Sequence, residues 1–306
     1  FGISPAIPIA IVGLIVLAAL IKTEKQIERK NGVALLPQTF LKTPQVLAGL
    51  VANALMFFFM GAQSILMAPY LQLVSNWTPI EVGTISIITG VPTFVLALGI
   101  PKFAPKANPR HVIQFGYIAM AAALIIMAAS VTPNGSNAPI VYLGAFMAGV
   151  GAGAVSAHAS NIVALALPER DASQSGGIQS TMRNIGQAMG VALLGAILLL
   201  SITNSVRTNA ISNPNISPQV DSQIATLNID LGSDKVFEDQ IANISMTDSE
   251  RNELVKIEEQ ARYNSVRIAY VAGAVIVLLG LATTPAIKIL SHKQKQAIDY
   301  SHSKSE

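Results

Sequence analysis

The 306-residue sequence contains no cysteine, one tryptophan and few charged residues. The absence of cysteine excludes disulfides, thiolate nucleophiles and cysteine-based metal sites. Charged residues make up 12% of the chain, well below the roughly 25% typical of soluble proteins. So few charges cannot cover a water-soluble fold of this length, and 51% hydrophobic residues are too many for a disordered chain. The composition therefore indicates a membrane protein.

Motifs of common enzymes are also missing. The sequence has no P-loop, no GxSxG and no HExxH, and no second histidine or nearby acid lies at metal-ligand spacing from His158. We therefore expect a protein that is not an enzyme and that has no cofactor. The net charge of +3 is better explained by basic cytoplasmic loops than by nucleic-acid binding.

Long apolar runs dominate the sequence instead. Because a bilayer core about 30 Å thick needs roughly 20 apolar residues in a helix, seven runs are predicted to span a membrane. The runs cover residues 5–21, 44–73, 80–100, 111–131, 139–167, 176–202 and 263–290. They are too long for strands and do not alternate. The predicted fold class is an all-α integral membrane protein with seven transmembrane helices.

The distribution of basic residues predicts the orientation. Fourteen lysines and arginines fall on one side of the seven spans, whereas the short loops near Trp77 and Asn134 carry none. We therefore expect residues 22–43 and the tail 291–306 to be cytoplasmic, and the start of the chain to lie outside. Residues 204–262 would form a large extracytoplasmic loop. Within it, the capping box of Thr247 and Glu250 predicts a helix that begins at about Asp248 and continues into the last span.

The second span carries a stripe of methionines and amides. Spacings of three and four residues place these side chains on one helical face: Asn53, Met56, Met60, Gln63 and Met67. Methionine surfaces suit varied apolar partners, and amides are costly against lipid. The stripe is interpreted either as the wall of a cavity for a lipophilic substrate or as a helix-packing seam.

The fifth and sixth spans combine small and polar residues. His158 is the only histidine inside a span; it either exchanges protons or bonds between helices. Arg183 lies near the inner boundary, where we expect its side chain to reach water, as an anchor or as a gate residue. Asn161 and Gln187 add polar groups that should face protein or water. Small residues that allow close helix contact are Gly149, Gly153, Gly186 and Gly190.

A short basic hairpin separates the third and fourth spans. It carries Lys102, Lys106 and Arg110 together with three prolines. The hairpin is interpreted either as a topological signal alone or as a cytoplasmic latch between helices.

Several of these segments resemble a known family. Residues 175–195, SGGIQSTMRNIGQAMGVALLG, resemble the penultimate helix of the fourteen-helix drug:proton antiporters of the major facilitator superfamily. Residues 77–83 are similar to an outer loop of the same family, residues 149–153 and 167–177 to the preceding helix and inner loop, and the basic hairpin to a degenerate copy of its cytoplasmic loop. The resemblance implies a linker helix at 1–21 and a C-terminal six-helix bundle at 44–203 and 263–290. It also implies a missing N-terminal half of the same chain.

The resemblance implies an exporter in the plasma membrane. Such a protein moves small lipophilic or cationic compounds by alternating access, with the proton gradient as its energy source. The substrate pathway would include the stripe together with Tyr70, His158, Asn161 and Gln187. The family's proton-carrying acids lie largely in the N-terminal half. The alternatives are a seven-helix membrane receptor and a membrane scaffold without transport.

Overall fold

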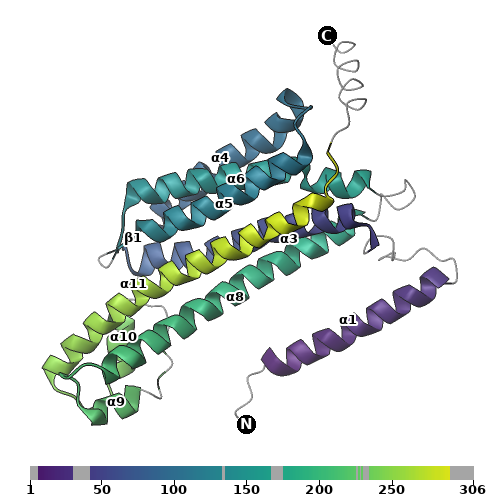
Figure 1. Cartoon of the computed structure of the whole chain (residues 1–306). Helices are drawn as coiled ribbons and strands as arrows, with labels where there is room; N and C mark the ends of the chain where they lie inside the picture. Colours follow the sequence, from purple (N-terminus) through teal and green to yellow (C-terminus); the bar gives the residue numbers. More distant parts are fainter. Residues whose placement is uncertain are drawn as a thin grey trace.

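The computed structural model describes residues 6–29, 42–132, 135–166, 175–224, 227, 229 and 234–289. The predicted tail 291–306 and the greater part of the predicted loop 22–43 lie outside these residues. Six described helices are long and apolar enough to cross a membrane. They are α3 (Pro44–Leu73), α4 (Pro79–Phe103), α5 (Pro109–Ser130), α6 (Ala138–Leu165), α8 (Ser175–Ile211) and α11 (Asp248–Leu279), the last of which continues into the 3₁₀ helix η1 (Gly280–Ala286). Figure 1 shows these helices as one elongated bundle, with the further apolar helix α1 (Ala6–Arg29) apart from it. The predicted all-α membrane fold is confirmed.

Local sequence signals fix where the helices begin. Proline occupies the first turn of α3, α4, α5 and α6, where its missing N–H has no helical partner to lose. Thr78 and Glu81 form a capping box at the start of α4, and Thr247 and Glu250 form the box predicted at the start of α11. The prediction that this last helix begins at Asp248 and runs directly into the seventh apolar stretch is confirmed.

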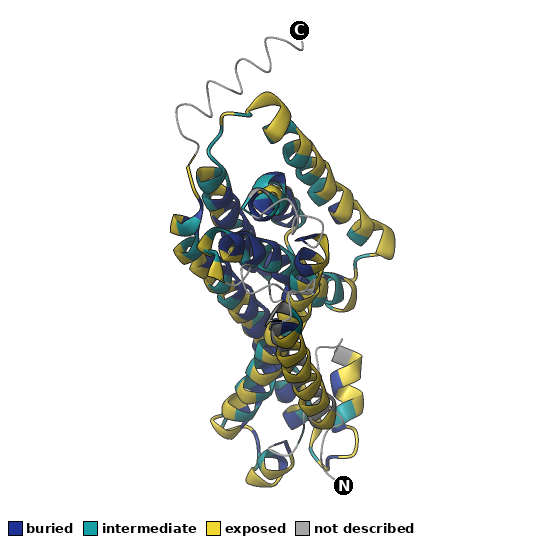
Figure 2. Cartoon of the chain, turned by 90° about the vertical axis from the view of Figure 1, so that its right-hand side faces the viewer, coloured by how far each residue is buried: buried dark blue, intermediate teal, exposed yellow. Residues whose placement is uncertain are grey.

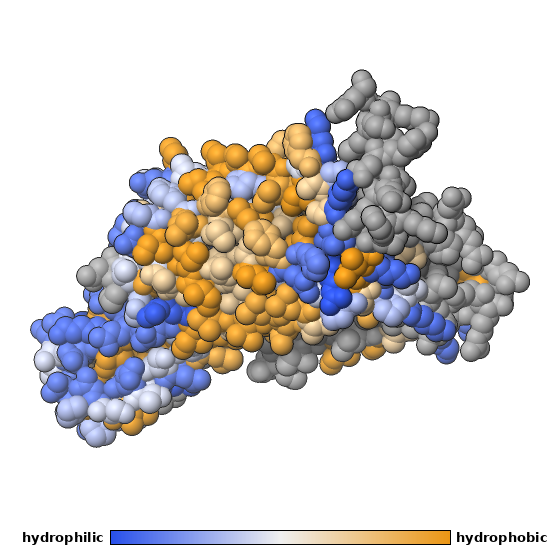
Figure 3. All heavy atoms as spheres, turned by 45° about the horizontal axis from the view of Figure 1, so that its top comes forward, coloured by the Kyte–Doolittle hydropathy of each residue, from blue (hydrophilic) through white to orange (hydrophobic). Residues whose placement is uncertain are grey.

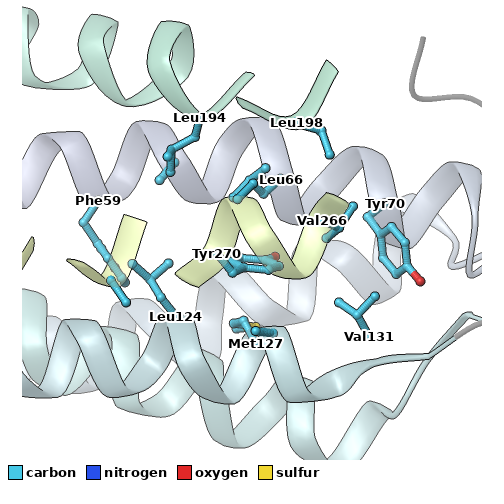
Figure 4. Close-up of a cluster of buried hydrophobic side chains, with 14 of the residues drawn as sticks. Phe59, Leu66, Tyr70, Leu124, Met127, Val131, Leu194, Leu198, Val266 and Tyr270 are labelled. Carbon is cyan, nitrogen blue, oxygen red and sulfur yellow. The ribbon is translucent and has the colours of Figure 1, made fainter. Parts of the chain in front are cut away.

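The helices pack around one large apolar core, with a small second cluster of Val46, Leu50, Val163 and Ile178 beside it. The most extensive contacts join α3 to α8 and α5 to α6, while α11 packs against both α5 and α8, and α4 packs mainly on α6. Figure 4 shows Phe59 and Leu66 of α3 meeting Leu124 and Met127 of α5 and Leu194 of α8 around α11. Figure 2, a ribbon coloured by burial, shows that the buried residues lie toward the middle of the bundle and the exposed ones on its outer faces. These exposed faces are rich in large apolar residues, as a lipid environment requires.

A short hairpin closes the bundle between α5 and α6. Strands β1 (Val131–Thr132) and β2 (Gly135–Ser136) pair antiparallel. The hydroxyl of Tyr70 on α3 lies 2.9 Å from the carbonyl oxygens of both Thr132 and Gly135 and shares its one proton between them. Tyr70 therefore fastens this turn to α3.

The described residues of the predicted extracytoplasmic segment 204–262 are largely helical. Helix α8 runs on to Ile211, α9 (Pro218–Ile224) and α10 (Asp234–Ile241) follow, and the first turns of α11 complete a helical cap. Figure 3 shows this end as a hydrophilic lobe beside a broad apolar belt. The cap has its own buried residues, continuous with the core of the bundle: Val206, Ile216, Val220, Ile224, Phe237, Ile241, Leu254 and Ile257. Burial of these side chains explains why the segment folds although its composition is polar.

Candidate functional site

A cavity of about 600 Å³ lies between α3 and α4, with α6 at its floor. Four residues of the predicted stripe line one wall, namely Met56, Met60, Gln63 and Met67. The opposite wall comes from α4, and Ala152 of α6 completes the lining. The α4 residues are Val82, Ile85, Ser86, Thr89, Gly90, Thr93, Phe94 and Ala97. Of the two interpretations of the stripe, the structure places these four residues on a cavity wall.

Most polar groups of the cavity are already occupied. The hydroxyl of Thr89 donates to the carbonyl of Ala145 at 3.2 Å, and that of Thr93 lies 3.1 Å from the carbonyl of Gly149. Gln63 differs, because its buried Oε1 has no hydrogen-bond partner in the described part of the chain. Because an unpaired buried acceptor is costly, a rotation of the Gln63 side chain toward the cavity would allow a bound molecule to satisfy this oxygen.

Arg183 forms a polar cluster that joins three helices. Its Nε donates to Oδ1 of Asn53 on α3 at 3.0 Å, and its Nη2 donates to Oγ of Ser160 on α6 at 2.8 Å. The guanidinium carbon lies 5.6 Å from the centre of the Phe57 ring, within the range of a cation–π contact. The side chain turns toward α3 and α6, which offer two acceptors and a ring at this level, and it stays partly exposed. Its role as an anchor or as a gate residue stays a prediction.

Asn53 and Tyr70 have structural partners outside the cavity. Asn53 Nδ2 donates to the carbonyl of Gly49 at 3.1 Å and lies 3.4 Å from Oε1 of Gln179. The buried Tyr70 is fixed to the hairpin. Neither residue lines the cavity, although both were predicted in the substrate pathway. Their helical register placed them near the stripe, but the register could not reveal these acceptors.

The other predicted pathway residues also lie outside the cavity lining. His158 is half-buried on α6, and its Nε2 is buried without a hydrogen-bond partner among the described residues. Asn161 is exposed. Gln187 lies in a separate shallow hollow of α8 with Asn184, Ala188, Val191 and Ala192.

The four predicted packing glycines lie at two helix crossings. A Cβ atom at Gly186 or Gly190 of α8 would overlap the backbone of Ala54 or Phe58 on α3. A Cβ at Gly149 of α6 would overlap the carbonyl of Thr89 on α4, and one at Gly153 would lie 2.8 Å from the carbonyl of Thr93. The glycines therefore permit backbone-to-backbone contact within the α3–α8 and α4–α6 pairs.

The basic hairpin lies where α4 ends and α5 begins. Lys102 is in the last turn of α4, with its Nζ 5.4 Å from the centre of the neighbouring Phe103 ring. Lys106 is exposed, and Arg110 is partly buried in the first turn of α5. A latch function for these residues stays a prediction.

Six long apolar helices with a methionine-lined cavity between two of them fit a multi-pass membrane protein. Comparison with known proteins identifies the family. The sequence profile of the Major Facilitator Superfamily matches residues 3–191, and the chain belongs to this superfamily. This assignment points to a non-enzymatic transport protein and replaces the receptor alternative.

One curated relative extends the comparison. The chain is similar to the probable actinorhodin transporter of Streptomyces coelicolor, with 23% identity over 200 residues. The match covers 63% of this chain and 34% of that protein. The chain thus matches about a third of the length of this relative.

Proposed function

We propose that this bundle is the C-terminal half of a proton-coupled exporter that carries small lipophilic compounds across the cell membrane by alternating access. The observation that supports the proposal is the methionine-walled cavity between α3 and α4. The second half would be an N-terminal six-helix bundle of the same protein. In this arrangement the basic end of the bundle and the tail are cytoplasmic, and the helical cap is outside.

The chemistry of the cavity suits varied apolar molecules. Its volume of about 600 Å³ falls within the range of roughly 300–1,000 Å³ common for small-molecule sites. Methionine side chains are flexible and polarizable, so they can repack around different shapes. Gln63 supplies one free acceptor, which can orient a substrate without restricting its apolar part.

Proton coupling needs titratable groups. Among the described lining residues there is no carboxylate, so this half offers no counter-ion for a cationic substrate inside the cavity. We therefore assign the proton-carrying acids to the N-terminal half, with His158 of α6 as the titratable contribution of this bundle.

The cavity assignment is tested by changing its wall without removing the helix. Met60→Arg places a long charged side chain in the cavity, and Met60→Leu keeps an apolar side chain there as the matched control. We expect the arginine variant of the complete protein to lose efflux of lipophilic fluorescent dyes from cells and the leucine variant to keep it. Normal efflux by an arginine variant that reaches the membrane in wild-type amounts would refute the assignment. Unchanged dye accumulation with and without the wild-type gene would favour the scaffold alternative.

A further inference from the structure

Arg183 lies outside the cavity lining but beside Met56, which lines one end of it. Ala152, Ser156 and Ser160 recur every four residues on α6 and so share one face. Ala152 lines the cavity, the Ser156 hydroxyl meets Sδ of Met56 at 3.0 Å, and Ser160 accepts from Arg183. From Ala152 to Ser160 this face of α6 spans eight residues, or about 12 Å along the helix. On α3 the residue that contacts Arg183 is likewise next to the cavity-lining one, because Asn53 is one turn from Met56.

The charge of Arg183 is not neutralised by the described residues. Its two hydrogen bonds go to the neutral side chains of Asn53 and Ser160, and no described carboxylate pairs with it. An arginine has five N–H donors, so three remain available. Nη1 bonds to none of the described residues and is not among the buried polar atoms that lack a partner, so its two N–H donors are accessible.

We propose that Arg183 binds the acidic group of an amphipathic organic anion whose apolar body fills the cavity. This assignment of substrate class rests on the function proposed above. Guanidinium binds carboxylates through paired N–H donors, and a partly desolvated site strengthens that attraction. A charged residue within a span is costly unless it has such a use.

The surroundings of Arg183 fit an amphipathic molecule. The ring of Phe57 holds the guanidinium from one side, and Asn53 and Ser160 fix its plane. Met56 lies between the guanidinium and the main cavity. Because methionine has three rotatable bonds and no branch, it can move aside for a bound molecule. The acidic group then lies beside Arg183 and the apolar body along Met60 and the α4 wall.

The experiment compares two probes that differ in one group. The carboxylate 1-pyrenebutyrate and the neutral alcohol 1-pyrenebutanol share the same apolar body. Binding to the complete purified protein is measured from the rise in unfolding temperature with probe concentration. A charge-assisted hydrogen bond contributes about a tenfold to hundredfold gain in affinity, so the wild-type protein should prefer the carboxylate by that factor.

Three variants assign this preference to one side chain. Arg183→Gln should bind both probes alike, with unchanged affinity for the alcohol. Arg183→Lys keeps the charge without the planar donors and should retain part of the preference. Arg267→Gln removes one charge from an exposed side chain that bonds Tyr263, and it should behave as the wild type.

The outcomes separate the two proposals. Equal binding of both probes by the wild-type protein overturns the anion assignment and leaves the cavity proposal standing. A carboxylate preference that persists in a folded Arg183→Gln protein also overturns it. If Arg183→Gln does not fold, Arg183→Lys provides the test. A carboxylate preference that is undiminished in the lysine variant contradicts recognition by the planar guanidinium group. Binding of neither probe overturns both the anion assignment and the cavity proposal.

Discussion

The crossing of α3 and α8 is expected to be the least tolerant place in the bundle for an added methyl group. Gly186 of α8 lies so close to α3 that its Cβ would overlap the carbonyl oxygen of Ala54. Backbone cannot rotate away as a side chain can, so Gly186→Ala must separate the two helices. Gly195 lies on the same helix, but its Cβ would meet only Ile65 Cγ1, at 3.6 Å. That distance is an ordinary van der Waals contact.

The two positions form a matched pair for estimating the cost. In either variant, the higher helix propensity of alanine stabilises the folded protein by about 0.5–1 kcal/mol relative to glycine. Overpacking at Gly186 costs about 1–3 kcal/mol, whereas Gly195→Ala carries no such cost. The difference between the variants therefore isolates the helix crossing. We expect Gly186→Ala to be less stable than Gly195→Ala by about 1–3 kcal/mol.

Thermal unfolding of the purified proteins in one detergent measures this difference. For chains of this size each kcal/mol corresponds to about 2–4 °C in the midpoint, so Gly186→Ala should unfold about 2–12 °C below Gly195→Ala. The same order should appear in the yield of folded protein. Equal midpoints for the two variants would refute the close backbone contact between α3 and α8.

Three further predictions concern single hydrogen-bonding groups. Tyr70→Phe removes the hydroxyl that holds the β1–β2 hairpin and should destabilise the protein by about 1–2 kcal/mol, measured by thermal unfolding. The backbone N–H of Thr247, with further bonds from the Thr247 hydroxyl and Ser217, lowers the pKa of Glu250 from 4.5 to about 2. The stabilisation by Glu250 is then complete above about pH 4.5 and is lost as the pH falls toward 2. Amide protection at the start of α11, corrected for the intrinsic exchange rate, should therefore decrease between about pH 4.5 and 2 in the wild type. It should not decrease in Glu250→Gln. His158→Ala should change the pH dependence of efflux; an unchanged profile would make this histidine structural.

The long apolar runs made the main helices predictable from sequence alone. A run of about 20 apolar residues has few stable alternatives to a membrane helix, and first-turn prolines and capping boxes mark several of the starts. The stripe of Met56, Met60, Gln63 and Met67 was visible because all four residues share one helix. Its α4 counterpart was not, because Thr89 and Phe94 reach the cavity only through the packing of two helices.

The direction taken by long polar side chains depended on partners distant in sequence. Arg183 bonds to Asn53, which is 130 residues away, and Tyr70 reaches Gly135 across 65 residues. No local sequence pattern predicts such pairs. The helical cap is a different case, because Leu194, Leu198, Ile202, Val206 and Ala210 are buried at a spacing of four. That periodicity continues past the predicted end of the span and would have indicated the longer helix.

The placement of the glycines bears on how the cavity can change width. Gly149 and Gly153 allow α4 and α6 to pack closely, and Gly186 and Gly190 allow α8 and α3 to do so. The cavity opens between α3 and α4, which have few direct contacts with each other. Its two walls therefore belong to two tightly packed pairs. Backbone contacts of this kind shift as units rather than deform. We expect any widening to occur as sliding between α3 and α6, where the flexible side chain of Met56 contacts Ser156 and the cluster of Arg183 bridges the two helices.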